Sequence, residues 1–413
     1  MRTDCVTVKM GLRLKLASSK TLALAQATIR LWASGLPPSD LTIYKMILTQ
    51  CAVCATDLGL SLGKKCGRCS TRYCGAACQV QHWKEGGHDT LCKKIKKAGG
   101  AEQYNANKKY AEAVAVAAEK CAEDTKGQTC YICTQALHWK TKEGLVRGCS
   151  CRGTAGFAHV SCLAEQAKIL FEEAEENNLV AKASAALRRW DKCSLCEQEY
   201  HGVVKCALGW ACWKTYVGRP ETDWARGSAM TRLGNGLQDA QHHDEALSVR
   251  EADLAMMRRL GASEESILAT QSNLAGSYSQ LGRPEALRML RDVYCGRLKI
   301  DGEEHDFTLM AANNYANSLL LLGRFEEAKS LLRKAVPVAR RVLGEGDSTT
   351  LRMRKSYALA LYKDPAATLD DLREAVTTLE DTERIARRVL GGAHPLTVDI
   401  EGELQKARDA LEK

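Results

Sequence analysis

The chain has 413 residues, of which 45% are apolar and 26% are charged, and a formal net charge of +9. This length and composition suit two or three globular domains, and no apolar run approaches the roughly 20 residues of a membrane-spanning helix, so we expect no membrane span. Nineteen cysteines are the unusual feature. Because no convincing signal peptide precedes them, we expect a cytoplasmic or nuclear protein whose clustered cysteines bind metal.

The positive charge is concentrated near the start of the chain. Residues 1–127 hold 20 Lys and Arg against 10 Asp and Glu, and the rest of the chain is nearly neutral. Nucleic-acid binding is therefore an alternative function, but this stretch lacks the interleaved aromatic residues that such a surface needs, which argues against it. We interpret residues 1–50, with a helix-like apolar spacing from Leu22 to Trp32, as an N-terminal extension of unassigned role.

Residues 51–92 contain four pairs of cysteine or histidine at the spacings of metal ligands. A Cys-x-x-Cys knuckle points two thiolates at one ion, and residues four apart share one face of a short helix. The pairs are Cys51/Cys54, Cys66/Cys69, Cys74/Cys78 and His88/Cys92.

Together with the Tyr-Cys-x-x-x-Cys-Gln run and the His82-Trp83 dipeptide, this order resembles the MYND zinc finger. The resemblance implies a surface for short proline-containing peptides beside Gln79 and Trp83, although Trp83 packing over the zinc core is the alternative. His82 is then left outside the ligand set. The resemblance also implies two interleaved zinc sites, Cys51, Cys54, Cys74, Cys78 and Cys66, Cys69, His88, Cys92.

A helical linker is predicted over 93–127, and a second cluster follows within 128–200. It again has four ligand pairs, and its Cys-x-Cys, seven-residue gap and His-x-x-Cys core resembles the RING-CH (RING-variant) finger. The pairs are Cys130/Cys133, Cys149/Cys151, His159/Cys162 and Cys193/Cys196. Cross-braced pairing in that family implies one site of Cys130, Cys133, His159 and Cys162, and another of Cys149, Cys151, Cys193 and Cys196.

The resemblance also implies a possible activity, because RING-CH fingers serve as ubiquitin ligases that recruit a ubiquitin-conjugating enzyme. It implies that Ile132, in the first knuckle, is a docking residue for that enzyme. The family places a Trp shortly after the His-x-x-Cys pair, where this chain has Gln166, and the gap from Cys162 to Cys193 is long. Trp190 is a substitute for that Trp or, in the interpretation we favour, a core residue.

The remaining half of the chain is predicted to be helical. We interpret residues 201–225 as a capping helix or linker. Residues 226–413 repeat the pattern helix, Leu-Gly turn, helix, polar loop, with a period of 41 or 42 residues that stretches to 47 at the end. Single helix pairs cannot bury their apolar faces, so about four stacked units should form an α-solenoid.

This layout resembles the tetratricopeptide repeats of kinesin light chain. In that family, asparagines of the groove hold the backbone of a bound peptide, and Asn273 and Asn314 match this position, whereas Ser356 in the third unit does not. An ordinary helix-surface role for the asparagines is the alternative.

The sequence thus predicts a mostly α protein with two small cross-braced zinc-binding domains followed by an α-solenoid, and about four Zn²⁺ per chain. The favoured function is an adaptor or scaffold that binds proteins or peptides. The alternative is a RING-CH-type ubiquitin ligase. Since each finger is too small to bury a core, metal removal should unfold both fingers and largely spare the repeats.

Overall fold

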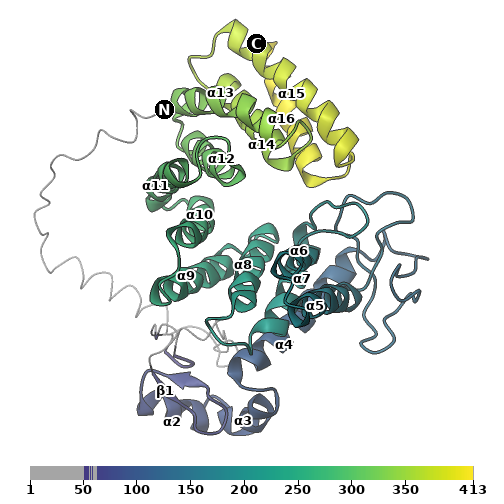
Figure 1. The fold of residues 1–413 in the computed structure, drawn as a ribbon, viewed down its shortest axis with the longest axis vertical. Coiled ribbons are helices and arrows are strands. Elements are labelled where there is room, and N and C mark those ends of the chain that lie inside the picture. Colours follow the sequence, from purple (N-terminus) through teal and green to yellow (C-terminus); the bar gives the residue numbers. More distant parts are fainter. Residues whose placement is uncertain (1–50, 55, 57, 59–62, 413) are drawn as a thin grey trace, which may run out of the picture. The chain divides into compact units, whose positions relative to one another are not determined.

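The computed structural model describes residues 51–54, 56, 58 and 63–412; the predicted N-terminal extension, with its helix-like stretch, lies outside this part of the chain. The described residues are mostly helical with very little strand, as predicted, and a series of helices fills the second half of the chain (Figure 1). The cysteine and histidine clusters come before these helices in the chain. No helix among them is both long enough and apolar enough to cross a membrane.

The first finger is built from short elements. A two-residue antiparallel ribbon pairs Lys64 with Tyr73, and two helices follow it. The side chains of Tyr73 and Ile95 are buried, but few other large apolar residues are available to form a core here. The elements are β1 (Lys64–Lys65), β2 (Arg72–Tyr73), α2 (Ala76–Lys84) and α3 (His88–Lys97).

The second finger lies between two long helices. Its first half has little regular structure, apart from a bridge between Val146 and Ala158, and its second half is helical. The elements of this region are α4 (Ala101–Lys120), α5 (Val160–Glu176), α6 (Val180–Leu187), a single 3₁₀ turn η1 (Arg188–Trp190) and α7 (Gly202–Tyr216).

One hydrophobic core joins this finger to its helical neighbours. Trp190 and Trp213 are fully buried, and the ring of Tyr216 makes edge-on contacts with Phe171 and Trp190 at centroid distances of 5.4 and 6.0 Å. The preferred interpretation of Trp190 as a core residue is confirmed. The same cluster of buried residues runs from α4 through the finger and α7 to α8 and α9. α7 is buried on almost every side, so its packing is that of a central helix.

The repeats form antiparallel helix pairs that pack in series. The turn after α10 and the turn after α12 each follow a leucine with a glycine, Gly282 and Gly323, whose φ values of 65° and 69° favour glycine. The helices are α8 (Trp224–Asp239), α9 (His243–Arg259), α10 (Glu264–Gln280), α11 (Glu285–Ile300), α12 (Asp306–Leu321), α13 (Phe325–Val342), α14 (Ser348–Tyr362), α15 (Leu369–Val389) and α16 (Pro395–Leu411).

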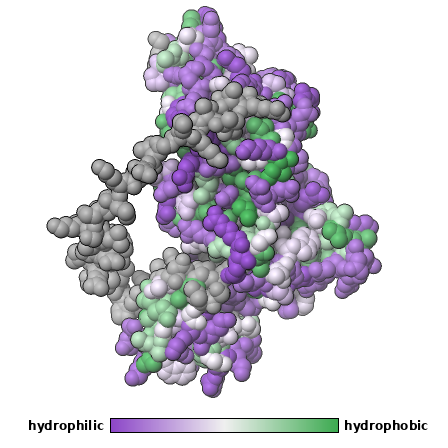
Figure 2. Space-filling view, turned by 60° about the vertical axis from the view of Figure 1, so that its left-hand side comes forward, coloured by the Kyte–Doolittle hydropathy of each residue, from purple (hydrophilic) through white to green (hydrophobic). Residues whose placement is uncertain are grey.

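Side-chain caps and a second core stabilise these pairs. Asp223, Ser263 and Asp347 accept hydrogen bonds from backbone N–H groups at the starts of α8, α10 and α14. Apolar side chains from α10 to α16, mainly alanine and leucine, form the second buried cluster. The face of the molecule shown in Figure 2 is mainly hydrophilic, with apolar side chains gathered near its middle.

Candidate metal centres

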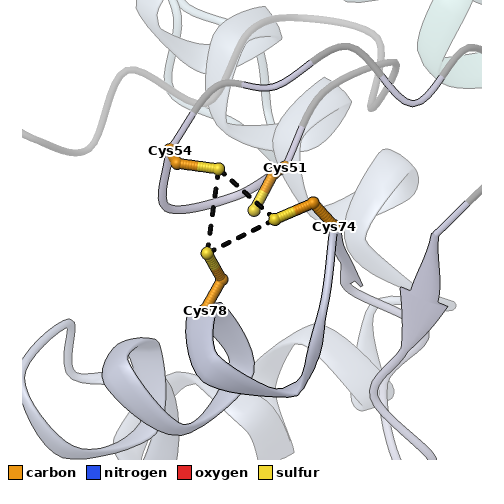
Figure 3. A group of neighbouring side chains, drawn as sticks. All are labelled: Cys51, Cys54, Cys74 and Cys78. Atoms are coloured by element: carbon orange, nitrogen blue, oxygen red, sulfur yellow. Dashed lines mark hydrogen bonds between the residues drawn. The ribbon is translucent and has the colours of Figure 1, made fainter.

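Four thiols of the first finger converge on one point (Figure 3). The Sγ atom of Cys54 lies 3.4 Å from that of Cys74 and 3.7 Å from that of Cys78, and the Sγ atoms of Cys74 and Cys78 are 3.4 Å apart. With Cys51, all four ligand atoms lie within 4.8 Å of one another. Tetrahedral zinc with bonds of about 2.3 Å would set its sulfur atoms roughly 3.8 Å apart, so these thiols fit that ion.

A second group lies beside the first and is fully buried. The Sγ atom of Cys69 is 3.3 Å from Nε2 of His88, and the Sγ atoms of Cys66 and Cys92 are 3.8 Å apart. His88 and Cys92 reach the same point because they stand four residues apart on α3. The structure therefore brings together alternating pairs along the chain, in the interleaved arrangement that the MYND resemblance implies.

The second finger contains a similar group around His159. Nδ1 of His159 lies 3.4 Å from Sγ of Cys133 and 3.6 Å from Sγ of Cys162, with Cys130 completing the group. Nε2 of the same ring faces the carbonyl oxygen of Ala136 at 3.4 Å. A backbone carbonyl at the second nitrogen fixes the orientation of the ring, as is usual for metal-binding histidine.

The fourth group consists of Cys149, Cys151, Cys193 and Cys196. Sγ of Cys151 lies 3.7 Å from Sγ of Cys193. The loop around this group needs a glycine at 156, where φ is +83° and an added Cβ would lie 2.6 Å from Cβ of Cys151.

Hydrogen bonds and burial shift the pKa values of these thiols in different directions. Hydrogen bonding by Thr56 lowers the pKa of Cys54 to about 6, and a hydrogen bond from Cys149 lowers the pKa of Cys193 to about 5. Burial raises the pKa of Cys78. Thiolate is the form that binds a metal ion, so a cation bound in these sites would displace the thiol protons.

His82 is close to the second group but does not belong to it. Its side chain is buried, its Nδ1 is 2.9 Å from the hydroxyl oxygen of Tyr73, and its ring lies 4.8 Å from that of His88. Burial and the neighbouring His88 lower the pKa of His82 to about 4. The buried ring of His82 thus packs against the ring of His88.

The two residues suggested for peptide binding by the first finger, Gln79 and Trp83, lie together on α2. Trp83 is 43% exposed although its ring is only 5.8 Å from that of His88, and Gln79 is half-buried. Val80, which is 51% exposed, extends this surface and was missed in the sequence. The sequence did not single out Val80, because an apolar residue in a short helix is buried as often as it is exposed.

A hydrogen bond joins the first and the last Cys-x-x-Cys knuckle of the second finger, residues 130–133 and 193–196. The hydroxyl oxygen of Tyr131 lies 3.1 Å from Oγ of Ser194, so the residues that follow these two, Ile132 and Leu195, belong to linked knuckles. Ile132 is half-buried against the core, whereas Leu195 is 51% exposed. Leu195 was missed in the sequence, although its place inside Cys193-x-x-Cys196 could have indicated it. Gln166 is half-buried on α5.

Of the two asparagines suggested for the repeat groove, Asn314 makes a side-chain contact between the first helices of successive pairs. Nδ2 of Asn314 donates to Oγ of Ser272 at 3.3 Å, and both side chains are half-buried. Asn273 is half-buried, and its backbone oxygen accepts from Arg250. In the third unit Ser356 is buried and donates to Oδ1 of Asn317, so it presents no group to a ligand.

Solved structures of helical repeats are similar to part of this chain, including the following three. The crystal structure of "Podosopora anserina putative kinesin light chain nearly identical TPR-like repeats" is 23% identical, with a TM-score of 0.33, and the match covers 56% of this chain and 97% of that one. A point variant of the same protein is 22% identical over the same shares, with a TM-score of 0.34. BtubC (BKLC) from P. vanneervenii is 16% identical, with a TM-score of 0.34, over 61% of this chain and 88% of that one.

No curated protein sequence matches the chain. Three family descriptions do match parts of it, and they bear out the resemblances drawn from the motifs. The two finger matches coincide with the four cysteine and histidine groups, and zinc is the ion expected there. In chain order the protein carries a MYND finger over residues 51–92, a RING-variant domain over 130–196 and a tetratricopeptide repeat over 308–348.

Proposed function

We propose that this protein is an adaptor or scaffold in a reducing compartment, the cytoplasm or the nucleus, whose two zinc fingers and repeats each bind protein or peptide partners. The observation that carries the proposal is the series of three modules of interaction families, with exposed apolar side chains beside the first metal sites. Each of the four groups holds one zinc ion, with the ligands Cys51, Cys54, Cys74 and Cys78; Cys66, Cys69, His88 and Cys92; Cys130, Cys133, His159 and Cys162; and Cys149, Cys151, Cys193 and Cys196. The ions supply structure.

The peptide surfaces of this proposal are the α2 face with Gln79 and Trp83, and the repeat face with Asn273 and Asn314. The first is supported by the exposure of Trp83, and the second by the position of Asn314 between neighbouring first helices. Binding of a panel of proline-containing peptides to the zinc-loaded protein tests the first surface. We expect Trp83→Ala to weaken that binding by about tenfold or more while the four zinc ions remain bound. Unchanged affinity would exclude this face.

A ubiquitin ligase is the second candidate, and the linked knuckles favour it. The hydrogen bond between Tyr131 and Ser194 links the knuckles that carry Ile132 and the exposed Leu195, and these two apolar side chains are the candidate docking area for a conjugating enzyme. Gln166 in place of the family's Trp weakens the case. A ligase of this kind acts by proximity, so purified protein with a panel of conjugating enzymes should form chains on itself, and Ile132→Ala should abolish them. No product with any enzyme would eliminate this candidate.

A further inference from the structure

A cleft of about 520 Å³ opens on the side of the RING-variant domain, where its first loop faces α4, α5 and α7. It combines aromatic side chains with three ammonium groups, and we call it the lysine cleft. The side chains used below are Tyr110, His138, Trp139, Lys140, Lys168 and Lys214.

An ordered loop holds Trp139 outward at the mouth of the lysine cleft. The side chain of Trp139 is 68% exposed, yet the backbone around it is fixed: His138 N–H donates to the oxygen of Glu143, and Lys142 N–H donates to the oxygen of His138. Nδ1 of the buried His138 accepts from Thr141 N–H at 3.1 Å. The exposed indole is therefore a preorganised apolar surface, which reduces the entropy lost on binding.

The positive charges of the lysine cleft are poorly neutralised. Nζ of the half-buried Lys214 lies 4.2 Å above the Tyr110 ring, and among the described residues no carboxylate reaches ion-pair distance of Lys214 or Lys140. Lys168 is 3.9 Å from Glu165 and 3.8 Å from Glu172, which is the outer limit of an ion pair. Burial lowers the pKa of Lys214, so an incoming anion would relieve an unfavourable charge.

Two carboxylates lie near this cluster: Glu165 lines the cleft and is the partner of Lys168, and Glu143 is held by other groups. The two carboxylate oxygens of Glu143 accept from the N–H and the hydroxyl of Ser161 at 2.7 and 2.8 Å, at the start of α5. That arrangement stabilises the helix start and leaves Lys214 without a carboxylate partner in the cleft.

The lysine cleft differs from the surface considered for a conjugating enzyme. Ser161 and Lys168 face it and stand seven residues apart, on one side of α5. Gln166 lies about 160° around the helix from Lys168, since each residue turns the helix by about 100°. The two faces of α5 can thus be occupied independently.

We propose that the lysine cleft binds an acidic segment of a partner protein, with an apolar side chain of that segment against Trp139 and its carboxylates against Lys140, Lys168 and Lys214. A carboxylate placed against the half-buried Lys214 forms a partly desolvated pair, which is stronger than a surface ion pair. This site goes beyond the proposed peptide surfaces, because neither α2 nor the repeats contribute to it.

The probe for this site is a fluorescent twelve-residue peptide of Asp and Glu around one Phe, titrated with the zinc-loaded full-length protein and followed by anisotropy. We expect Lys214→Met, which keeps the packing on Tyr110 but removes the charge, and the double change Lys140→Gln with Lys168→Gln each to weaken binding about tenfold or more. Trp139→Ala should weaken it similarly. Lys182→Gln removes an exposed lysine of the same domain outside the cleft and should change affinity less than about twofold.

Equal binding by all variants and by Lys182→Gln would overturn the proposal. A Gln-rich peptide around the same Phe that binds as well as the acidic one would also overturn it. If a single-stranded RNA displaces the peptide and itself binds more tightly, the acidic-protein assignment is wrong. Circular dichroism and zinc content check folding, and if Lys214→Met does not fold, the exposed double variant decides.

Discussion

The two zinc fingers of this chain use the same ligand chemistry but sit in different surroundings. In the MYND finger the metal groups are the main interior, since Tyr73 and Ile95 are among the few large buried side chains near them. In the RING-variant domain the metal groups border a core that continues through Trp190 and Trp213 into α8 and α9. Metal binding is therefore almost the only source of stability for the MYND finger, whereas metal binding and hydrophobic packing both stabilise the RING-variant domain.

This difference changes what metal removal should do. We expect chelation to unfold the MYND finger locally, because its metal-binding free energy is its folding free energy. Loss of metal from the second finger should loosen α7 and, through the common core, α8 and α9, while α11 to α16 with their separate core remain folded. The expectation that metal removal largely spares the repeats is thereby refined, since α8 and α9 share the core of the second finger.

The largest effect should come from removing one ligand in each finger. We expect Cys193→Ser to destabilise the protein by more than about 4 kcal/mol and to abolish the near-ultraviolet circular dichroism of the buried tryptophans. Cys74→Ser should remove one zinc ion and leave that signal nearly intact. Zinc content and thermal unfolding measure both. If the two variants lose the near-ultraviolet signal equally, the hydrophobic core does not depend on the second finger more than on the first, and the comparison fails.

A smaller loss of stability should distinguish the contribution of hydrophobic packing from that of metal binding in the second finger. Trp190→Ala should lower the free energy of unfolding by about 3–5 kcal/mol, because a fully buried indole leaves a large cavity. Trp139→Ala, at an exposed position of the same domain, should change it by less than about 0.5 kcal/mol. Chemical denaturation with zinc present measures both. A small effect of Trp190→Ala would mean that metal alone holds this domain together.

The sequence predicts the metal-ligand groupings better than it predicts this shared core. Spacings such as Cys193-x-x-Cys196 encode a local geometry, and the resemblance to known fingers supplied the pairing. The core depends on contacts between residues far apart in the chain, such as Phe171 with Tyr216, and no local pattern specifies them. Residues 201–225 illustrate the limit: an apolar stretch with two lone cysteines predicts a helix, but not that it is buried on almost every side.

Where that core meets the repeats, stability should depend on pH. Burial raises the pKa of Asp253 on α9 to about 7, although Thr231 and Arg250 lie close to it. The folded protein thus binds this proton more tightly than the unfolded chain, so the contribution is fully present below about pH 4 and is lost as the pH rises towards 7. Asp253→Asn should raise the melting temperature at about pH 8 and leave it nearly unchanged at about pH 4.

The exposed residue Asp292 provides the control for this effect, since Asp292→Asn should change the melting temperature little at either pH. An equal gain for Asp253→Asn at both pH values would show that the gain comes from packing and not from titration. Repeating the measurement after chelation tests whether the junction survives without the second finger's metal.

The smallest effect should come from α15, far along the chain from both fingers, where hydrogen bonds between neighbouring residues stabilise the start of the helix. Thr368 starts α15 with a reciprocal pair of hydrogen bonds: its Oγ1 accepts from Asp371 N–H at 3.1 Å, and Oδ2 of Asp371 accepts from Thr368 N–H at 3.0 Å. Thr368→Ala should cost about 1 kcal/mol, and the cost should be the same with and without metal because α15 belongs to the second core. Hydrogen exchange of the first turn of α15 measures it. A cost that changes on chelation would mean that the fingers and the last repeats are energetically coupled, and the division into a metal-dependent and a metal-independent half would fail.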